Sequence, residues 1–511
     1  MNRKVLLILA AIILAAMVAR LWGLSGRGLF SPDETRYYRD AVMAKASIDG
    51  YCSSPVVKNF KGFMASLLPL TEAFAGKPGH TFLGLLALYL FGAHQYSVLL
   101  MNALLATATV PVVFLIGRKL HNEKTGLIAA ALLAVCSAHV YFSRSFLAHT
   151  DQAFFLMLGT YLYLDQKRAF AALCLGYAFL VHPTGIIYFL PFAGYEFFLL
   201  ITRKRRFGQI TGFTACFFLP FLALESVSLF GRSDFGSLIV ALKQSYLGQM
   251  LYNSGEALAL GAHNNRSLGP FHYGIMSLLS NGVLATSVYA AGLAGGIVFF
   301  IKQRNAGAFI TCAVPAALFI YWQYVTGHER LFREIIFLFP FFCIMSAVLM
   351  VRLNRKLAAA LLIVLIGEGA WYSAKAIMIT SEYPRIERFL IDQRVDKVMT
   401  PSEYISTTTD VLMPGLKDVK IYRVAGSEEA REVRAREGVS FMIATPGEHE
   451  TGRMVSRRAS PVISIREPNR AYLPSFYEDM RIRGELGAGA CAQNADLTTV
   501  AVYDIRKEKR S

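Results

Sequence analysis

The chain has 511 residues, of which 54% are hydrophobic, and its mean hydropathy is positive at +0.42. This apolar content exceeds that of ordinary soluble domains and argues against a water-soluble globular protein. The net charge of +17 does not indicate nucleic-acid binding, because much of the basic charge lies in short clusters between apolar runs, as the positive-inside rule describes.

The chain begins with a predicted membrane helix over about residues 5–24. The segment MNRKVLLILAAIILAAMVARLWGL resembles a signal peptide in its basic start, but its apolar stretch is too long and no A-x-A site follows cleanly. Arg3 and Lys4 predict a cytoplasmic N-terminus in a cell (inner or plasma) membrane. The apolar stretches over 63–92 are predicted to be interfacial helices, since Lys77, Pro78 and Gly79 interrupt them.

Further apolar runs continue this pattern and predict about 11 transmembrane helices. The predicted spans lie at about 96–117 and 126–142, on both sides of 167–168, before 203–206, before 230, over 273–302, on both sides of 328–334 and over 358–372. Every strongly basic short loop then falls on one side of the membrane. The expected fold is therefore a polytopic α-helical membrane protein.

The helix after Asp151 reaches Asp165 after only about a dozen apolar residues, which is short of a full span. Two arrangements would explain this short helix. Either Asp151 lies below the outer membrane surface in a polar cavity, or the helix enters the membrane only in part. An ionisable group at that depth is expensive unless it faces protein or water, which favours an active-site acid. Alternatively, Thr150 and Asp151 serve as helix caps.

From residue 376 charged residues become frequent and apolar runs shrink to strand length. Four strands are predicted at DKVMT, VKIYRV, VSFMIAT and TVAVYDI, with helices at YPRIERFLID and EEAREVRAREG. We expect two domains, a transmembrane domain over 1–375 and a soluble extracytoplasmic α/β domain over 376–511. The second contains no glycine-rich nucleotide loop.

The predicted outer side concentrates the reactive side chains. Nine of the ten histidines fall there on this topology, and Cys52 and Cys491 could form a disulfide there. Carboxylates facing a substrate hydroxyl can act as a general base, and clustered Arg and Lys hold phosphate. Such a set suits transfer of a group from a lipid phosphate, because cations stabilise the departing phosphate.

Five segments carry a resemblance to a known family. Residues 90–164 are similar to three consecutive helices of that family, with Arg144 and Asp151 at matched positions, and GPFHYGIM is similar to its aromatic segment opening helix eight.

The other three segments are shorter than residues 90–164. PDETRYYRDAVMA resembles the first outer loop of the GT-C glycosyltransferases, and more closely the protein O-mannosyltransferase and aminoarabinose-transferase group, glycosyltransferase family 39 and its relatives. FKGFMASLLPLTEAFAG is similar to that family's lysine segment, with Lys61 at the lysine. HERLFREIIFLFPFF resembles its Arg-Tyr-x-x-Pro element, with Arg333 matched and Glu334 in place of the usual Tyr.

This resemblance implies an inverting membrane glycosyltransferase with a GT-C transmembrane catalytic domain. It implies a polyprenyl-phosphate sugar donor and an acceptor glycolipid, glycan or protein on the outer side. It implies Asp33 as the leading catalytic carboxylate, Glu34 beside it and Asp151 as the second acid. Candidates for the donor phosphate are Lys61, Arg333 and Arg266. Other candidate site residues are Arg36, Tyr37, Arg144, His182, His263 and His272. The resemblance requires no metal. A divalent metal stays an alternative, because nine of the ten histidines fall on the predicted outer side.

Two other classes stay open at this point. The chain could be a lipid or glycolipid transporter or flippase, with charged outer residues lining a pathway, or a non-catalytic assembly protein. Against a transporter, the sequence shows no paired halves, no repeat and no obviously broken helices.

Overall fold

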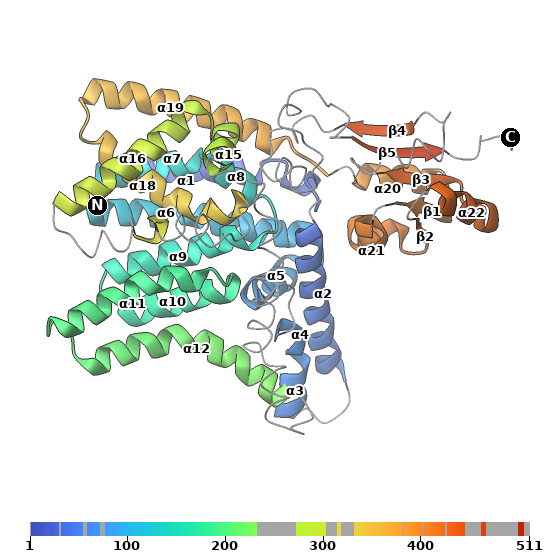
Figure 1. Cartoon of the computed structure of the whole chain (residues 1–511), viewed down its shortest axis with the longest axis horizontal. Helices are drawn as coiled ribbons and strands as arrows, with labels where there is room; N and C mark the ends of the chain where they lie inside the picture. Colours follow the sequence, from blue (N-terminus) through green and yellow to red (C-terminus); the bar gives the residue numbers. More distant parts are fainter. Residues whose placement is uncertain are drawn as a thin grey trace. The chain divides into compact units, whose positions relative to one another are not determined.

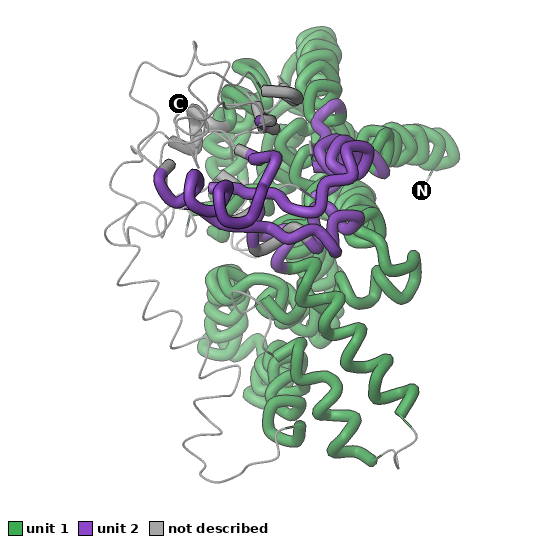
Figure 2. Tube along the Cα trace, turned by 90° about the vertical axis from the view of Figure 1, so that its right-hand side faces the viewer, with its two compact units in different colours: residues 1–24, 37–377 green, residues 25–36, 378–511 purple. Residues whose placement is uncertain are grey.

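The structure is a computed structural model of the chain. It describes residues 2–29, 32–54, 59–71, 77–231, 272–302, 314–317, 332–381, 383–401, 403–424, 427–444, 461–466 and 499–504. The chain divides into two compact units, coloured separately in Figure 2. Unit 1 comprises residues 1–24 and 37–377, and unit 2 comprises residues 25–36 and 378–511.

Unit 1 is helical throughout its described residues (Figure 1). Its helices are α1 (Arg3–Leu21), α2 (Pro32–Ser53, whose start up to Arg36 belongs to unit 2), α3 (Phe60–Ser66), α4 (Leu68–Thr71), α5 (Pro78–Phe91), α6 (Gln95–Leu120), α7 (Glu123–Ala134), α8 (Ser137–Ser143), α9 (Ala148–Leu164), α10 (Arg168–Val181), α11 (Gly185–Ile201), α12 (Phe207–Gly231), α15 (His272–Asn281), α16 (Val283–Lys302), the 3₁₀ helix η4 (Phe332–Leu338), α18 (Phe339–Met350) and α19 (Arg355–Ile377).

Within the described residues, five segments are long and apolar enough to cross a membrane. They are Arg3–Gly26, Gln95–Leu120, Phe207–Gly231, Arg333–Met350 and Arg355–Ile377. The pair α7 and α8 would add a sixth if its two helices form one span, and several shorter apolar helices accompany them. The chain is therefore a multi-pass membrane protein by its helices, and the count of about 11 spans stays a prediction.

Polar signals at the helix ends explain several boundaries. Helix α6 ends at the basic pair Arg118 and Lys119, which complements the negative end of the helix dipole. Helix α7 begins where the Asn122 side chain accepts a hydrogen bond from the Thr125 backbone N–H at 3.0 Å. The predicted span over 96–117 lies inside α6 because its apolar run is bounded by these charges.

Two of the predicted helices are broken, which corrects the expectation of continuous helices. The helix predicted over 126–142 bends by 60° between α7 and α8. The helix predicted over 273–302 breaks between α15 and α16 at Gly282, whose φ of +91° is one that few other residues adopt. At the second break the Glu368 carboxylate accepts hydrogen bonds from the backbone N–H groups of Leu284 (3.3 Å) and Ala285 (2.8 Å). A carboxylate at a helix N-terminus stabilises the restart of the helix.

Small residues allow the helices of unit 1 to pack closely. A Cβ atom on Gly176 of α10 would lie 2.0 Å from the backbone oxygen of Phe217 in α12. Phe217 also stacks on Phe189 of α11, with ring centroids 3.6 Å apart. Figure 1 shows α9 to α12 running alongside one another. Close approach at a glycine is a common way to associate helices in lipid, where hydrophobic burial contributes little.

Unit 2 contains a five-stranded mixed sheet in the order β2-β1-β3-β5-β4. The strands are β1 (Lys397–Thr400), β2 (Lys420–Arg423), β3 (Phe441–Ala444), β4 (Pro461–Arg466) and β5 (Thr499–Asp504). Strand β1 pairs in parallel with β2 and β3, whereas β5 is antiparallel to β3 and β4.

Helices α20 (Tyr383–Asp392), α21 (Glu403–Leu412) and α22 (Ser427–Glu437) accompany this sheet. Ile386 and Leu390 of α20 pack with Val398 and Phe441 of the strands in one apolar core. Strand β4 and helix α21 were not predicted. The extracytoplasmic location of this unit stays a prediction.

Candidate functional site

Unit 1 holds a group of polar side chains that come together from five separate segments. We call this group the polar cluster; its members are Tyr37, Lys77, His80, His149, Asp151, His182, Arg333 and Glu334. They come from α2, the start of α5, α9, the turn between α10 and α11, and η4. Most are buried, and buried polar groups in membrane helices are expensive unless they face protein or water. Such a group is therefore a candidate functional site.

A histidine and a carboxylate pair at the centre of the polar cluster. His80 Nδ1 lies 2.7 Å from Asp151 Oδ2, and neither side chain is exposed. Asp151 is not a helix cap, because the N-cap of α9 is Leu147 and Asp151 lies within its first turns. Among the described residues, His80 Nε2 and Asp151 Oδ1 have no hydrogen-bond partner. Unsatisfied buried polar atoms in a native protein call for an explanation, and a bound substrate or water is one.

A second group joins two histidines to one carboxylate. His149 Nε2 lies 3.1 Å from Glu334 Oε1, and His182 Nε2 lies 3.9 Å from Glu334 Oε2. The two imidazole rings are 4.7 Å apart between centroids. Burial lowers the pKa of His182 well below its ordinary value, so its imidazole is neutral at neutral pH.

Two cations complete the polar cluster. Lys77 is only 8% exposed, and its ammonium group donates a hydrogen bond to the Tyr37 hydroxyl at 2.5 Å. Burial lowers the pKa of His149, and the positive charges of Lys77 and Arg333 lower it further. A buried lysine and an arginine near one another form an environment suited to an anion such as phosphate.

The surrounding chain fixes where these side chains lie. Gly79 allows the start of α5 to approach the end of α10, because a Cβ atom there would lie 2.7 Å from the Val181 backbone nitrogen. The Tyr177 hydroxyl donates to the Gly79 carbonyl at 2.9 Å, which secures the same contact. Asn102 of α6 donates to the carbonyl groups of Ser145 and Leu147, which positions the segment leading into α9.

The predicted acids of the first loop belong to unit 2. Asp33 is half-buried in the first turn of α2. Glu34 is fully buried in an ion pair with Arg27 at 2.9 Å, an arrangement that favours a structural role for this carboxylate. Arg36 is exposed, whereas Tyr37 is buried in the polar cluster. The convergence of Asp33 with Asp151 stays a prediction.

Arg144 is 1% exposed and contacts backbone rather than a cavity. Its guanidinium group donates to the carbonyl oxygens of Arg20 (3.0 Å) in the last turn of α1, of Trp22 (2.7 Å) at its C-cap, and of Ile377 (3.1 Å) at the end of α19. These bonds join three helix ends that the predicted topology puts on one side of the membrane. They favour a structural role for Arg144.

Other predicted site residues fall outside the polar cluster or outside the described residues. Lys61 is exposed on α3. His272 begins α15, and its side chain is outside the described residues. Arg266, His263 and Cys491 also lie outside the described residues, so their predicted roles and the disulfide of Cys491 with Cys52 stay predictions.

Sequence reasoning missed four members of the polar cluster, namely Lys77, His80, His149 and Glu334. Lys77 and Pro78 directly precede an apolar helix, and that position was interpreted only as an interruption. His149 lies two residues before Asp151, so one helix start supplies both. Glu334 replaces a family tyrosine, and this departure was itself the available signal.

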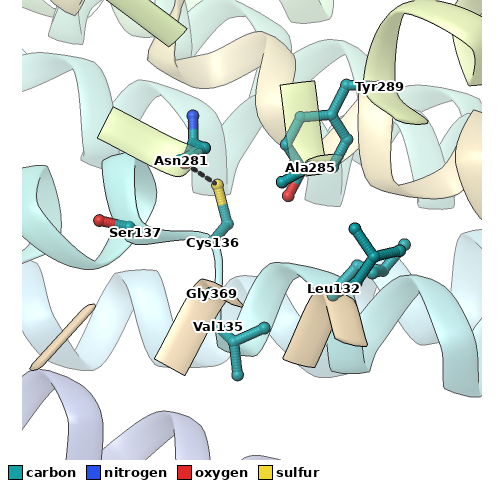
Figure 3. A pocket seen from close by; sticks show the side chains of 9 residues that line it. Leu132, Val135, Cys136, Ser137, Asn281, Ala285, Tyr289 and Gly369 are labelled. Carbon is teal, nitrogen blue, oxygen red and sulfur yellow. Dashed lines mark hydrogen bonds between the residues drawn. The ribbon is translucent and has the colours of Figure 1, made fainter. Parts of the chain in front are cut away.

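A separate small cavity lies where the broken helices meet (Figure 3). Leu132, Cys136, Asn281, Tyr289 and Gly369 are among the residues that line it. The Asn281 side-chain oxygen accepts hydrogen bonds from the Cys136 thiol (3.5 Å) and from the Ala138 N–H (3.0 Å) at the start of α8. No described member of the polar cluster lines this cavity, and its polar contacts serve to restart α8.

Residues 76–229 match the model of the family described as dolichyl-phosphate-mannose-protein mannosyltransferase. This matched segment contains Lys77, His80, His149, Asp151 and His182. An uncharacterized protein of Aquifex aeolicus (strain VF5) is 28% identical over 172 residues, covering 31% of this chain and 41% of that protein. The chain thus matches less than half of the length of this curated relative.

Solved structures share the fold along most of the chain. ArnT from Cupriavidus metallidurans bound to undecaprenyl phosphate has a TM-score of 0.52 and 12% identity, covering 99% of this chain and 98% of ArnT. The archaeal oligosaccharyltransferase AglB from Archaeoglobus fulgidus, in complex with an inhibitory peptide and a dolichol-phosphate, has a TM-score of 0.53 and 11% identity, covering 88% of this chain and 70% of AglB. The chain is therefore similar to the mannosyltransferase family over residues 76–229, and its fold is similar to that of these membrane enzymes along most of its length.

Proposed function

We propose that this protein transfers a sugar from a polyprenyl-phosphate donor to an acceptor on the outer side of the membrane, with inversion at the anomeric carbon. The observation that carries this proposal is the polar cluster, where the buried Lys77 and the partly buried Arg333 accompany a buried His80–Asp151 pair. Most of the polar cluster falls in the segment that matches the mannosyltransferase family. The lipid phosphates named for ArnT and AglB support a lipid-linked donor.

In this proposal Lys77 and Arg333 hold the donor phosphate. As the bond between the sugar and phosphate breaks, negative charge grows on the phosphate, and positioned cations stabilise it. Lys77 takes the role first predicted for Lys61, because Lys61 is exposed on α3 while Lys77 is buried among the other polar groups. Arg333 keeps its predicted role.

The acids act on the acceptor side of the reaction. For a hydroxyl acceptor, Asp33 removes the proton as the oxygen attacks the anomeric carbon from the face opposite the phosphate. Asp33 lies in the first turn of α2. Asp151 acts as the second acid, and its hydrogen bond to His80 orients it.

A transporter or flippase is the alternative, and one observation favours it. Unit 1 contains two broken helices, α7 with α8 and α15 with α16, and broken helices are common at transporter binding sites. The polar cluster does not lie at these breaks. The two functions therefore require a test that separates chemistry from movement of lipid.

The test measures product mass. The purified full chain is incubated with a panel of polyprenyl-phosphate sugars and mixed lipid and peptide acceptors, and products are identified by mass spectrometry. We expect one donor to give a product heavier by one sugar residue, and Asp33→Asn to abolish it while the protein still binds lipid. Asp49→Asn is the matched control, because Asp49 is an exposed acid on the same helix. Transbilayer movement of lipid without any sugar-bearing product would support the flippase instead.

A further inference from the structure

We propose that His149, His182 and Glu334 bind one divalent cation of the zinc class. One imidazole nitrogen from each histidine and one carboxylate oxygen lie within 4.8 Å of one another. The shortest separations are 3.1 Å for His149 with Glu334 and 3.9 Å for His182 with Glu334. The histidines are almost fully buried, and the Glu334 side chain is 12% exposed.

The ligand set has the chemistry of a zinc site with an open position. Zinc is bound by histidine nitrogen at about 2.0–2.1 Å and by carboxylate oxygen at about 2.0–2.2 Å, and two histidines with one glutamate occur where a fourth position stays open for water or substrate. Tetrahedral ligands at these bond lengths are about 3.3–3.4 Å apart. The separations of 3.1 and 3.9 Å lie on either side of this value but end on different oxygens of Glu334, and the three ligand atoms lie within 4.8 Å of one another, so the side chains must move closer together to hold a cation.

Further hydrogen bonds orient one ligand as such a site requires. His182 Nδ1 lies 2.8 Å from the Thr184 hydroxyl and accepts a hydrogen bond from the Thr184 backbone N–H at 3.3 Å, and these contacts hold the ring with Nε2 toward Glu334. Gln152 donates to that hydroxyl and to the His182 carbonyl, both at 3.1 Å. A second ring nitrogen held by a neighbouring group fixes the tautomer and the ring orientation of metal-binding histidines.

Two features of the polar cluster oppose the binding of a cation: nearby positive charge, and the ability of the three side chains to pair with one another without a metal. Lys77 and Arg333 carry positive charge near His149 and therefore repel a cation. The same three side chains could also stabilise one another through hydrogen bonds from the imidazoles to the carboxylate. This metal-free triad predicts that Zn²⁺ binds no better to the wild type than to variants that lack a ligand.

The deciding experiment counts bound metal on the full chain in detergent. The protein is stripped with a chelator, equilibrated with Zn²⁺, desalted and analysed by plasma mass spectrometry. We expect about one Zn²⁺ per chain, and background levels for the double variant with His149→Ala and His182→Ala. His94→Ala is the matched control, because His94 is exposed and lies outside the polar cluster. No sugar donor is needed, so the result is independent of the proposed transferase activity.

Two further measurements keep the inference testable if the double variant fails to fold. Thr184→Ala retains all three ligands but removes the orienting hydroxyl, and we expect its affinity for Zn²⁺ to fall by roughly 10–100-fold. Co²⁺ bound to the wild type should give the visible absorption of a four-coordinate site. A wild type that holds no more metal than background, or a Thr184→Ala variant with unchanged affinity, would overturn the inference.

Discussion

Replacing Lys77 with methionine tests the proposed phosphate site most directly. Methionine retains much of the length and apolar contact of the lysine stem but removes the ammonium group. That group donates to the Tyr37 hydroxyl and is 8% exposed, so it lies in a setting where charge is poorly screened. The change should weaken binding of a lipid phosphate and leave binding of the uncharged lipid unaltered.

The expected change in the dissociation constant follows from the loss of one hydrogen bond between the lysine ammonium group and the lipid phosphate. A hydrogen bond to a charged group contributes about 1.5–3 kcal/mol. This corresponds to a dissociation constant that rises by roughly 10- to 150-fold. The Tyr37 hydroxyl also loses its donor, so the free energy of unfolding should fall by about 1 kcal/mol.

Titration of the purified protein with undecaprenyl phosphate, followed by native mass spectrometry, measures the dissociation constant. Undecaprenol without phosphate gives the baseline for the apolar chain. Lys61→Met is the matched control, since Lys61 is exposed on α3 and should bind as the wild type does. The reasoning is refuted if Lys61→Met weakens binding as much as Lys77→Met, or if Lys77→Met binds undecaprenyl phosphate as tightly as the wild type does.

Three other substitutions test the packing and the helix ends, with unfolding free energies measured by SDS titration in mixed micelles. Gly176→Ala should lower the free energy of unfolding by about 1–3 kcal/mol, because the added methyl group meets the Phe217 carbonyl. The control Gly212→Ala has open space around it and should raise the free energy of unfolding by up to about 1 kcal/mol. Equal effects of the two substitutions would contradict the close approach of α10 and α12. Arg144→Met should lower stability by about 3 kcal/mol through three lost carbonyl contacts, and a neutral result would argue against its structural role. Glu368→Ala should lower stability by about 0.5–2 kcal/mol through the lost cap of α16, and no change would mean that solvent replaces the cap.

Local signals predicted most of the helices of unit 1. The apolar run ending at Arg118 and Lys119 predicted a span over 96–117, which lies within α6. The broken helices were missed because their causes are not local. The break at Gly282 is stabilised by Glu368, and no periodicity over 273–302 reveals that partner. Strand β4 was also missed, although it is longer than the four-residue strands β1, β2 and β3, all of which lie in predicted strand segments.

The composition of the candidate site was predictable only in part. Asp151 was recognised because an acid so close to an apolar run is expensive. The partners of that acid could not be recognised, since His80 precedes it by 71 positions and Glu334 follows His149 by 185. Only the folded helices bring such residues together. The family resemblance pointed to a lysine before an apolar helix, and Lys61 and Lys77 both fit that description.

The contacts of Arg144 have a consequence for biosynthesis. Its guanidinium group donates to two carbonyl oxygens at the end of α1 and to the carbonyl oxygen of Ile377, the last residue of α19. A ribosome that has inserted the first several helices leaves this cation partly unsatisfied in the translocon until residue 377 emerges. Nascent chains truncated before that point should therefore be targets for membrane quality-control proteases, even when every inserted helix is sound.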